Sequence, residues 1–197
     1  MSALARTLVL ASASPRRREL LRALKLPFRI APSHVSEEVA PCTPRRLVLE
    51  LALRKARAVA GRRKRALVLG ADTIVVCRGE VLNKPIDRED GRRILRSLNG
   101  RWHRVYTGVA LVDSESGRWW REAAVTRVKA RRLTAEELER FVGRHMDKAG
   151  AYAVQDHGDP FIERIVGPFD NVVGLPLASV RSLLRRALCA RRRKTAR

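Results

Sequence analysis

Short apolar runs alternate with amphipathic segments along the chain, and the two kinds of segment differ in their period. The run at 7–11 is short and apolar, and the run at 66–77 is rich in β-branched residues although Gly-Ala-Asp interrupts it; both are typical of buried strands. The segment 15–25 instead carries its leucines on one helical face. The pattern predicts strands at 7–11, 66–77, 104–113, 118–133, 150–155 and 161–167, and helices at 15–25, 44–60, 88–98, 137–145 and 174–188.

Capping signals mark where the first two predicted helices begin. Ser14-Pro15 and Thr43-Pro44 each combine an N-cap residue with a proline at the first helical position. Gly61 follows the second of these helices as a stop signal. Between the two helices lies a proline-rich stretch, which predicts a long loop.

Strands and helices that interleave in this way predict an α/β fold with a mixed sheet. The turn sequence SESG at 114–117 separates two long strand-like runs and predicts an antiparallel hairpin within that sheet. The length of 197 residues suits one ordinary hydrophobic core. We therefore expect a single domain over 1–190 and a basic, disordered tail over 191–197.

The formal net charge of +22 favours anionic binding partners. Nucleic acid is the obvious candidate, but the arginines are spread along the whole chain and no aromatic-rich recognition motif accompanies them. A generally basic surface accounts for the charge better, and it leaves nucleic acid open as a partner.

Cysteine and histidine spacing exclude several kinds of site. The three cysteines are far apart without a CxxC pair, which argues against a disulfide framework and a structural zinc site. The four histidines show no HExxH spacing. No apolar run reaches the roughly 20 residues of a membrane helix. We expect a cytoplasmic protein with no membrane partner.

The sequence SASPRRR at 12–18 is the first candidate for chemistry. A helix N-terminus has unpaired N–H groups and a partial positive charge, so it binds phosphate readily. Ser12 and Ser14 add hydroxyls, and Arg16 and Arg17 add charged, fork-shaped donors. The alternative is that Ser14 only caps the helix and the arginines are solvated; this stretch alone does not decide between them.

Asp72, in the sequence GADT, is the second candidate. It follows the run LVLG at a predicted strand end, where α/β proteins tend to place residues that face a ligand. Its carboxylate suits a divalent metal or the orientation of a water molecule, whereas the plainer reading is an aspartate that forms a turn.

Four more charged residues lie at positions of interest. Glu37 and Glu38 occupy the proline-rich loop, Lys55 lies within an apolar helix, and Lys84 precedes a proline at a strand end. Each alone reads as a solvated charge. Together with Arg16 and Asp72 they supply what phosphoryl chemistry needs: acids for metal, cations for negative charge and a base for water.

Jointly, these stretches resemble a known family. The sequences LASASPRRRELL, EE, LALRKA, GADTIVV, EVLNKP, LNGRWHRVYTGVAL, KAGAYAVQ and NVVGLPL occur in the order and spacing of the Maf nucleotide pyrophosphatases, also labelled septum-formation inhibitors. The resemblance covers about residues 7–188. It implies a mixed, curved central sheet flanked by helices with a central cleft, a fold shared with inosine-triphosphate pyrophosphatases, and a homodimer.

The resemblance also implies an activity and the residues that carry it. Members hydrolyse nucleoside triphosphates to the monophosphate and pyrophosphate with a divalent metal, Mg or Mn. Asp72 matches the general base and a metal ligand, and Glu37 and Glu38 match the metal site. The positions that match the phosphate site are Ser12, Ser14, Arg17, Lys55 and Lys84.

Three positions resemble the branch that acts on dTTP and UTP: Arg16, Thr73 and Gln155. An arginine and an amide there can pair the carbonyl and N–H groups of uracil or thymine, whereas a methylated, positively charged guanine favours an aromatic ring beside an acid. The family often has glycine after this glutamine, and this chain has Asp156-His157 instead, which puts fine base selectivity in doubt.

The sequence therefore predicts a metal-assisted dTTP/UTP pyrophosphatase, with house-cleaning of modified pyrimidine nucleotides and a part in division arrest as its cellular roles. One alternative is a pyrophosphatase for 7-methyl-GTP or another modified nucleotide. An alternative of another class is a non-catalytic, basic nucleic-acid-binding regulator, for which the charge of +22 is the support.

Overall fold

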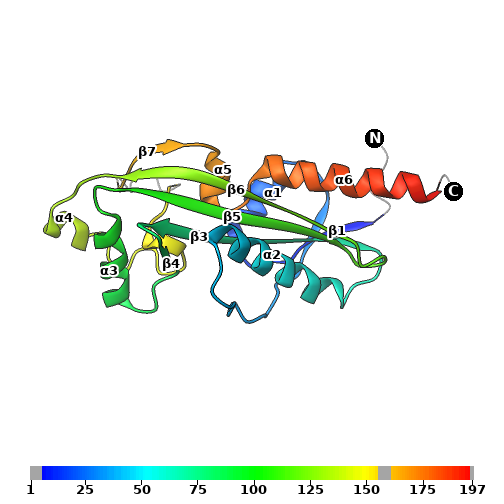
Figure 1. The fold of residues 1–197 in the computed structure, drawn as a ribbon, viewed down its shortest axis with the longest axis horizontal. Helices are drawn as coiled ribbons and strands as arrows, with labels where there is room; N and C mark the ends of the chain where they lie inside the picture. The colour runs from blue at the N-terminus through cyan, green and yellow to red at the C-terminus, as the bar shows by residue number, and fades with distance from the viewer. Residues whose placement is uncertain (1–5, 155–160, 196–197) are drawn as a thin grey trace. The chain divides into compact units, whose positions relative to one another are not determined.

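The computed structural model describes residues 6–154 and 161–195, in which strands and helices alternate along the chain (Figure 1). The strands are β1 (Thr7–Leu10), β2 (Phe28–Ile30), β3 (Ala66–Cys77), β4 (Glu80–Leu82), β5 (Trp102–Asp113), β6 (Trp119–Ala130) and β7 (Ile162–Val166). The helices are α1 (Pro15–Arg22), α2 (Pro44–Ala60), α3 (Arg88–Leu98), α4 (Ala135–Glu139), α5 (Phe169–Val173) and α6 (Leu177–Thr195), with a 3-10 turn η1 (Ala149–Ala151).

The strands of the described residues form one sheet of seven, in the order β2-β1-β3-β5-β6-β7, with β4 paired to β3. Strand β1 runs parallel to both β2 and β3, whereas β4 is antiparallel to β3 and β7 to β6. The predicted α/β class with a mixed sheet flanked by helices is confirmed. The curvature and the central cleft stay predictions.

The chain divides into two compact units. The first comprises Met1–Asp72, Thr107–Ala124 and Gly174–Arg197, and the second comprises Thr73–Tyr106 and Val125–Val173. Strands β3, β5 and β6 each contribute residues to both units. Helix α6 continues past residue 191, where the sequence predicted a tail, and ends at Thr195.

In the first unit, helices cover both faces of the sheet. Alternate residues of β3 such as Leu67 and Leu69 pack with Leu21 of α1 and Leu183 of α6. The residues between them, such as Val68, pack with α2 instead. Figure 1 shows α6 and α2 on opposite sides of the strands. Because successive side chains of a strand point to opposite faces, the even-numbered residues of β3 face α2.

The second unit has its own apolar core. One buried cluster contains Ile94, Leu95 and Leu98 of α3, aromatic residues that include Phe161, and the inward side chains of the strand segments. Helix α3 has Asp87 as its N-cap, whose side chain accepts from the N–H of Asp90.

Within the described residues of the chain, no helix is both long and apolar enough to cross a membrane.

Two predicted elements differ from the observed ones. The strand predicted at 150–155 is wrong over its described residues, 150–154. The turn η1 occupies Ala149–Ala151, where Gly150 and Ala151 have φ of 78° and 57°, and residues 152–154 form no strand. A strand cannot continue through left-handed residues. The helix predicted over 137–145 ends much earlier, as α4, and Gly143 has φ of 87°.

Close packing of α2 on the sheet depends on two glycines. A Cβ at Gly70 of β3 would lie 2.2 Å from the carbonyl oxygen of Ala52 and 2.8 Å from the backbone nitrogen of Ala56. A Cβ at Gly108 of β5 would lie 2.2 Å from the carbonyl oxygen of Val48. Helix α2 therefore approaches the sheet at a distance that only glycine allows.

We predict that Gly70→Ala destabilises the protein, because helix backbone rather than a flexible side chain fills the space that the methyl group needs. The expected loss in the free energy of unfolding is about 1–3 kcal/mol or more. Urea unfolding measures it. Gly61→Ala is the matched control, since Gly61 has a φ of −61° and its nearest neighbour lies at 3.6 Å. An equal effect of both substitutions would contradict the packing account.

Candidate active site

The candidate site is built around Asp72. The predicted place of this residue at a strand end, or in a turn, is wrong, because β3 continues through it to Cys77 and Asp72 lies near the middle of the strand. Asp72 is an even-numbered residue of the strand and faces α2, as Val68 does. It is 6% exposed. A buried carboxylate needs a partner, because transfer of a charge out of water costs several kcal/mol, on the order of 5, unless it is paired.

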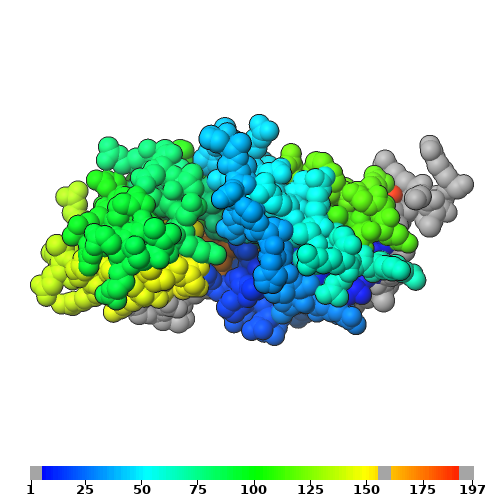
Figure 2. All heavy atoms as spheres, turned by 90° about the horizontal axis from the view of Figure 1, so that it is seen from below, coloured from blue at the N-terminus to red at the C-terminus, as the bar shows by residue number. Residues whose placement is uncertain are grey.

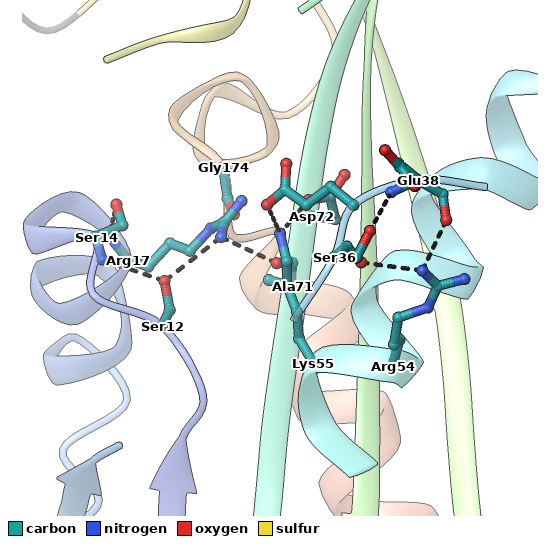
Figure 3. Close-up of polar contacts among 11 residues, drawn as sticks. Ser12, Ser14, Arg17, Ser36, Glu38, Arg54, Lys55, Ala71, Asp72 and Gly174 are labelled. Atoms are coloured by element: carbon teal, nitrogen blue, oxygen red, sulfur yellow. Dashed lines mark hydrogen bonds and ion pairs between the residues drawn. The ribbon is translucent and has the colours of Figure 1, made fainter. Parts of the chain in front are cut away.

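Lys55 supplies that partner from α2. The buried stripe of this helix includes Val48, Ala52, Ala56 and Val59, and Lys55 lies on the same stripe. Its ammonium nitrogen is 2.6 Å from a carboxylate oxygen of Asp72, and both side chains are about nine-tenths buried (Figure 3). The helical period that builds the core thus also brings the ammonium to Asp72.

Glu37 brings a second carboxylate to the same ammonium. Its Oε1 atom lies 2.6 Å from Lys55 Nζ, and its side chain is 55% exposed. The loop at 31–43 that carries it runs over the surface beside α2 (Figure 2). Two carboxylates from separate segments therefore converge on one cation, one from the interior and one from the solvent side.

The segment between β1 and α1 lies next to this pair. Ser14 caps α1, and its hydroxyl accepts from the N–H of Arg17. Arg17 donates from Nη1 to the carbonyl oxygen of Ala71 at 2.9 Å and from Nε to that of Gly174 at 2.9 Å (Figure 3). The hydroxyl of Ser12 accepts from the N–H of Ser14 and from Arg17. Arg17 thus binds the residue that directly precedes Asp72.

The charges act on one another. Burial raises the pKa of Asp72 above its usual range, and the charges of Lys55 and Arg17 oppose that rise. Burial also lowers the pKa of Arg17, while the charge of Asp72 raises it. A carboxylate with a raised pKa, held ionised by neighbouring cations, is suited to accept a proton from a bound water molecule.

The first unit thus brings together six of the predicted site residues: Ser12, Ser14, Arg17, Glu37, Lys55 and Asp72. Glu38 is exposed, and its carboxylate contacts none of the described residues. Its backbone N–H donates to Ser36 instead.

The other predicted residues lie elsewhere. Arg16 is a half-buried residue of α1. Thr73 follows Asp72 on β3 and points to the opposite face of the strand. Lys84 belongs to the second unit and is exposed, two residues after β4 ends. Gln155 lies outside the residues that the structure describes.

Two contributors were not predicted from the sequence. The carbonyl of Gly174 accepts from Arg17, and Arg54 donates to the carbonyl oxygens of Ser36 and Glu38. Gly174 begins the sequence GLPL, and this motif could have indicated that the residue belongs to the site. No pattern distinguishes Arg54 from the other arginines on the outer face of its helix.

Two carboxylates of the site, those of Asp72 and Glu37, could bind a metal ion. In the part of the chain at 6–154 and 161–195, no group of three or more His, Cys, Asp and Glu side chains is placed to bind one metal ion. Asp72 and Glu37 nevertheless present hard oxygen donors to a shared cation position. Mg²⁺ is often held by one or two carboxylates together with substrate phosphates, so the residues fit a metal that binds with a phosphorylated substrate.

Comparison with known proteins finds one family: the Maf-like protein model matches residues 7–187. A dTTP/UTP pyrophosphatase of Elusimicrobium minutum (strain Pei191) is 48% identical over 170 residues, which cover 86% of this chain and 92% of that protein. A dTTP/UTP pyrophosphatase of Moorella thermoacetica is 52% identical over 180 residues, with 90% and 93% covered. A solved nucleoside-triphosphatase / dITP/XTP pyrophosphatase of Mycobacterium abscessus is similar at 16% identity and a TM-score of 0.45, with 93% and 96% covered.

We predict that Lys55→Met destabilises the protein at pH 7 by about 3 kcal/mol, because it leaves a buried carboxylate without its ammonium. The pKa of Asp72 in this variant rises further, so the folded variant holds a proton that the unfolded chain releases. Its stability therefore falls as pH rises through that pKa, and the loss is smaller at pH 5 than at pH 7.

Urea unfolding at both pH values measures this difference. Lys64→Met is the control, since Lys64 is exposed and its replacement is expected to change the free energy of unfolding by less than about 0.5 kcal/mol. A loss for Lys55→Met that does not depend on pH would contradict the ion-pair account.

Proposed function

Because this chain belongs to the Maf family of Maf-like proteins, we propose that it is a nucleoside triphosphate pyrophosphatase that hydrolyses dTTP and UTP to the monophosphate and pyrophosphate. The observation that carries the proposal is the sequence identity of 48–52% to proteins of that activity over nearly the whole chain. The buried cluster of Asp72, Lys55 and Glu37 supports it with the acids and the cation that phosphoryl chemistry uses.

We assign Asp72 the role of general base. It would accept the proton of the water molecule that attacks the α-phosphorus of the triphosphate, and the P–O bond to the pyrophosphate leaving group would break. Its raised pKa favours proton acceptance, and Lys55 orients the carboxylate through the 2.6 Å contact. In a buried site such a fixed charge pair acts with little screening by water.

The triphosphate is proposed to be neutralised by Lys55, Arg17 and Lys84, together with the hydroxyls of Ser12 and Ser14. The N-terminus of α1 adds partial positive charge at the same loop. Arg17 already binds two carbonyl oxygens, so part of its function is to hold the loop against β3.

A divalent cation, Mg²⁺ or Mn²⁺, would be held by Asp72 and Glu37 together with phosphate oxygens, and Glu38 remains a third predicted ligand. When bound, such an ion neutralises charge on the phosphates and stabilises the charge that develops in the transition state.

Base selection is proposed to rest on Arg16, Thr73 and Gln155, which would pair the polar edge of uracil or thymine. A site that pairs those groups penalises a base that leaves them unpaired. Homodimer formation and a part in division arrest stay predictions from the family resemblance, and a cytoplasmic location stays a prediction from the sequence.

The test is pyrophosphate release from a panel of dTTP, UTP, CTP, dATP and 7-methyl-GTP with Mg²⁺ or Mn²⁺. We expect turnover of dTTP and UTP to exceed that of the others, and Asp72→Asn to reduce it by about 10²–10⁴-fold, which is the usual contribution of a general base. Preference for 7-methyl-GTP would contradict the proposed pyrimidine substrates and favour the alternative of a 7-methyl-GTP pyrophosphatase.

Two controls separate the remaining outcomes. Circular dichroism establishes that Asp72→Asn is folded, and near-full turnover in that folded variant would refute the role of Asp72. No turnover of any nucleotide by the wild type, combined with duplex DNA binding that weakens steeply with salt, would favour the nucleic-acid-binding alternative.

The pH dependence follows from the raised pKa of Asp72. Only the ionised carboxylate accepts a proton, so kcat/KM falls as pH decreases through that pKa, at a higher pH than for an ordinary aspartate of pKa about 3.9. Glu37→Gln removes a negative charge that raises this pKa, so its acidic limb moves to lower pH. Lys55→Gln removes an opposing positive charge and moves the limb of its residual activity to higher pH. Shifts of the same sign in both variants would contradict the assignment.

A further inference from the structure

Arg54 bridges two backbone carbonyls of the loop that carries Glu37. Its Nη1 atom donates to the carbonyl oxygen of Ser36 at 2.9 Å and to that of Glu38 at 2.7 Å (Figure 3). The two acceptors flank Glu37 on either side. The hydroxyl of Ser36 accepts from the N–H of Glu38 at 3.2 Å and tightens the same turn.

The loop needs such support because regular structure does not hold it. Residues 31–43, all of which the structure describes, form neither helix nor strand. The side chain of Glu37 is also more than half exposed. A long, exposed side chain on an irregular loop loses conformational freedom when it is fixed, and this loss opposes the contact.

The helix sets the geometry of the contact. Arg54 and Lys55 are neighbours on α2, so one helical segment contacts the loop twice: Lys55 binds the carboxylate of Glu37, and Arg54 binds the backbone on both sides of it. Helix α2 is in turn fixed against the sheet by the close approach at Gly70. The position of Glu37 relative to Asp72 is thereby fixed through α2, which contacts both the loop and the sheet.

We propose that Arg54 is a positioning residue for Glu37, which fixes the loop backbone so that this carboxylate meets the one of Asp72 at a single cation position. The inference rests on the proposed function, since it assigns Glu37 to the cation that accompanies the triphosphate. Arg54 itself touches no reacting group. A planar guanidinium suits the role because its hydrogen-bond donors are fixed in one plane.

The predicted consequence concerns both the loop and the metal. In Arg54→Gln the carbonyls of Ser36 and Glu38 lose their donor, the loop samples other conformations, and Glu37 spends less time at the cation position. We expect the half-saturating Mg²⁺ or Mn²⁺ concentration to rise and kcat/KM for dTTP to fall, by about 10- to 100-fold, which is typical when support for a ligand is removed. Arg54→Lys restores part of the loss.

Arg57→Gln is the matched control. Arg57 lies on the same helix and is exposed, with its guanidinium 5.5 Å from the ring of Trp119, away from the loop. This variant removes the same charge from α2 and is expected to keep wild-type kinetics. All variants should melt within about 2 °C of the wild type, because exposed substitutions change stability little.

A double-mutant cycle tests whether Arg54 acts through Glu37. If it does, Arg54→Gln adds less than about twofold to the loss already caused by Glu37→Gln, because the two residues serve one contact. Multiplicative losses in the double variant would overturn the proposal, since Arg54 would then act independently of Glu37.

Hydrogen exchange of the metal-free protein separates this inference from the proposed function. The backbone amide of Glu38, which donates to the Ser36 hydroxyl at 3.2 Å, should exchange faster in Arg54→Gln than in Arg57→Gln or the wild type, whatever the substrate. Unchanged exchange there overturns the positioning role even if the enzyme turns over dTTP. Faster exchange in a protein without any nucleotide turnover would uphold the contact and refute the proposed function.

Discussion

The contact between Lys55 and Asp72 is the interaction on which the rest of the site depends. It places an ammonium and a carboxylate in the interior at 2.6 Å, where each is tolerated only because of the other. The contact exists because α2 packs so closely on the sheet that only glycine fits at Gly70 and Gly108. It also exists because Lys55 lies on the buried face of the helix, toward the strand. Glu37 then adds a carboxylate that contacts Lys55, and Arg17 adds a cation that binds the residue next to Asp72.

The helical and strand periods of the sequence suffice to predict the α/β class and the core faces. They also mark Lys55 and Asp72 as candidates, since Lys55 lies within an apolar helix and Asp72 follows an apolar run. Each alone, however, is equally consistent with a solvated or a turn-forming residue. The two periods do not predict η1, because the left-handed backbone at Ala151 has no signature in the side chain. The choice between Glu37 and Glu38 in contacting Lys55, and the bridge by Arg54, depend on how an irregular loop lies against a helix, which no local pattern encodes.

The charge of the chain also acquires a role at the site. Forty-two basic residues against twenty acidic ones create a positive field, which attracts nucleotides and speeds their encounter. Such a field does not select a position on the surface. In the proposed mechanism the position is selected where Asp72 and Glu37 converge on the ammonium of Lys55, so that acids and a cation lie together. The long-range attraction needs only the excess of positive charge, whereas the local chemistry needs charges of both signs.

The hydrogen bond from Arg17 to Gly174 joins residues that are 157 positions apart. During synthesis the amino-terminal strand and helix leave the ribosome long before the carbonyl that Arg17 binds has been made, because chains grow at about 5–20 residues per second. A nascent chain thus carries Asp72, Lys55 and Glu37 for several seconds without the contact that fixes its first loop. Completion of the site is deferred until almost the whole polypeptide has emerged.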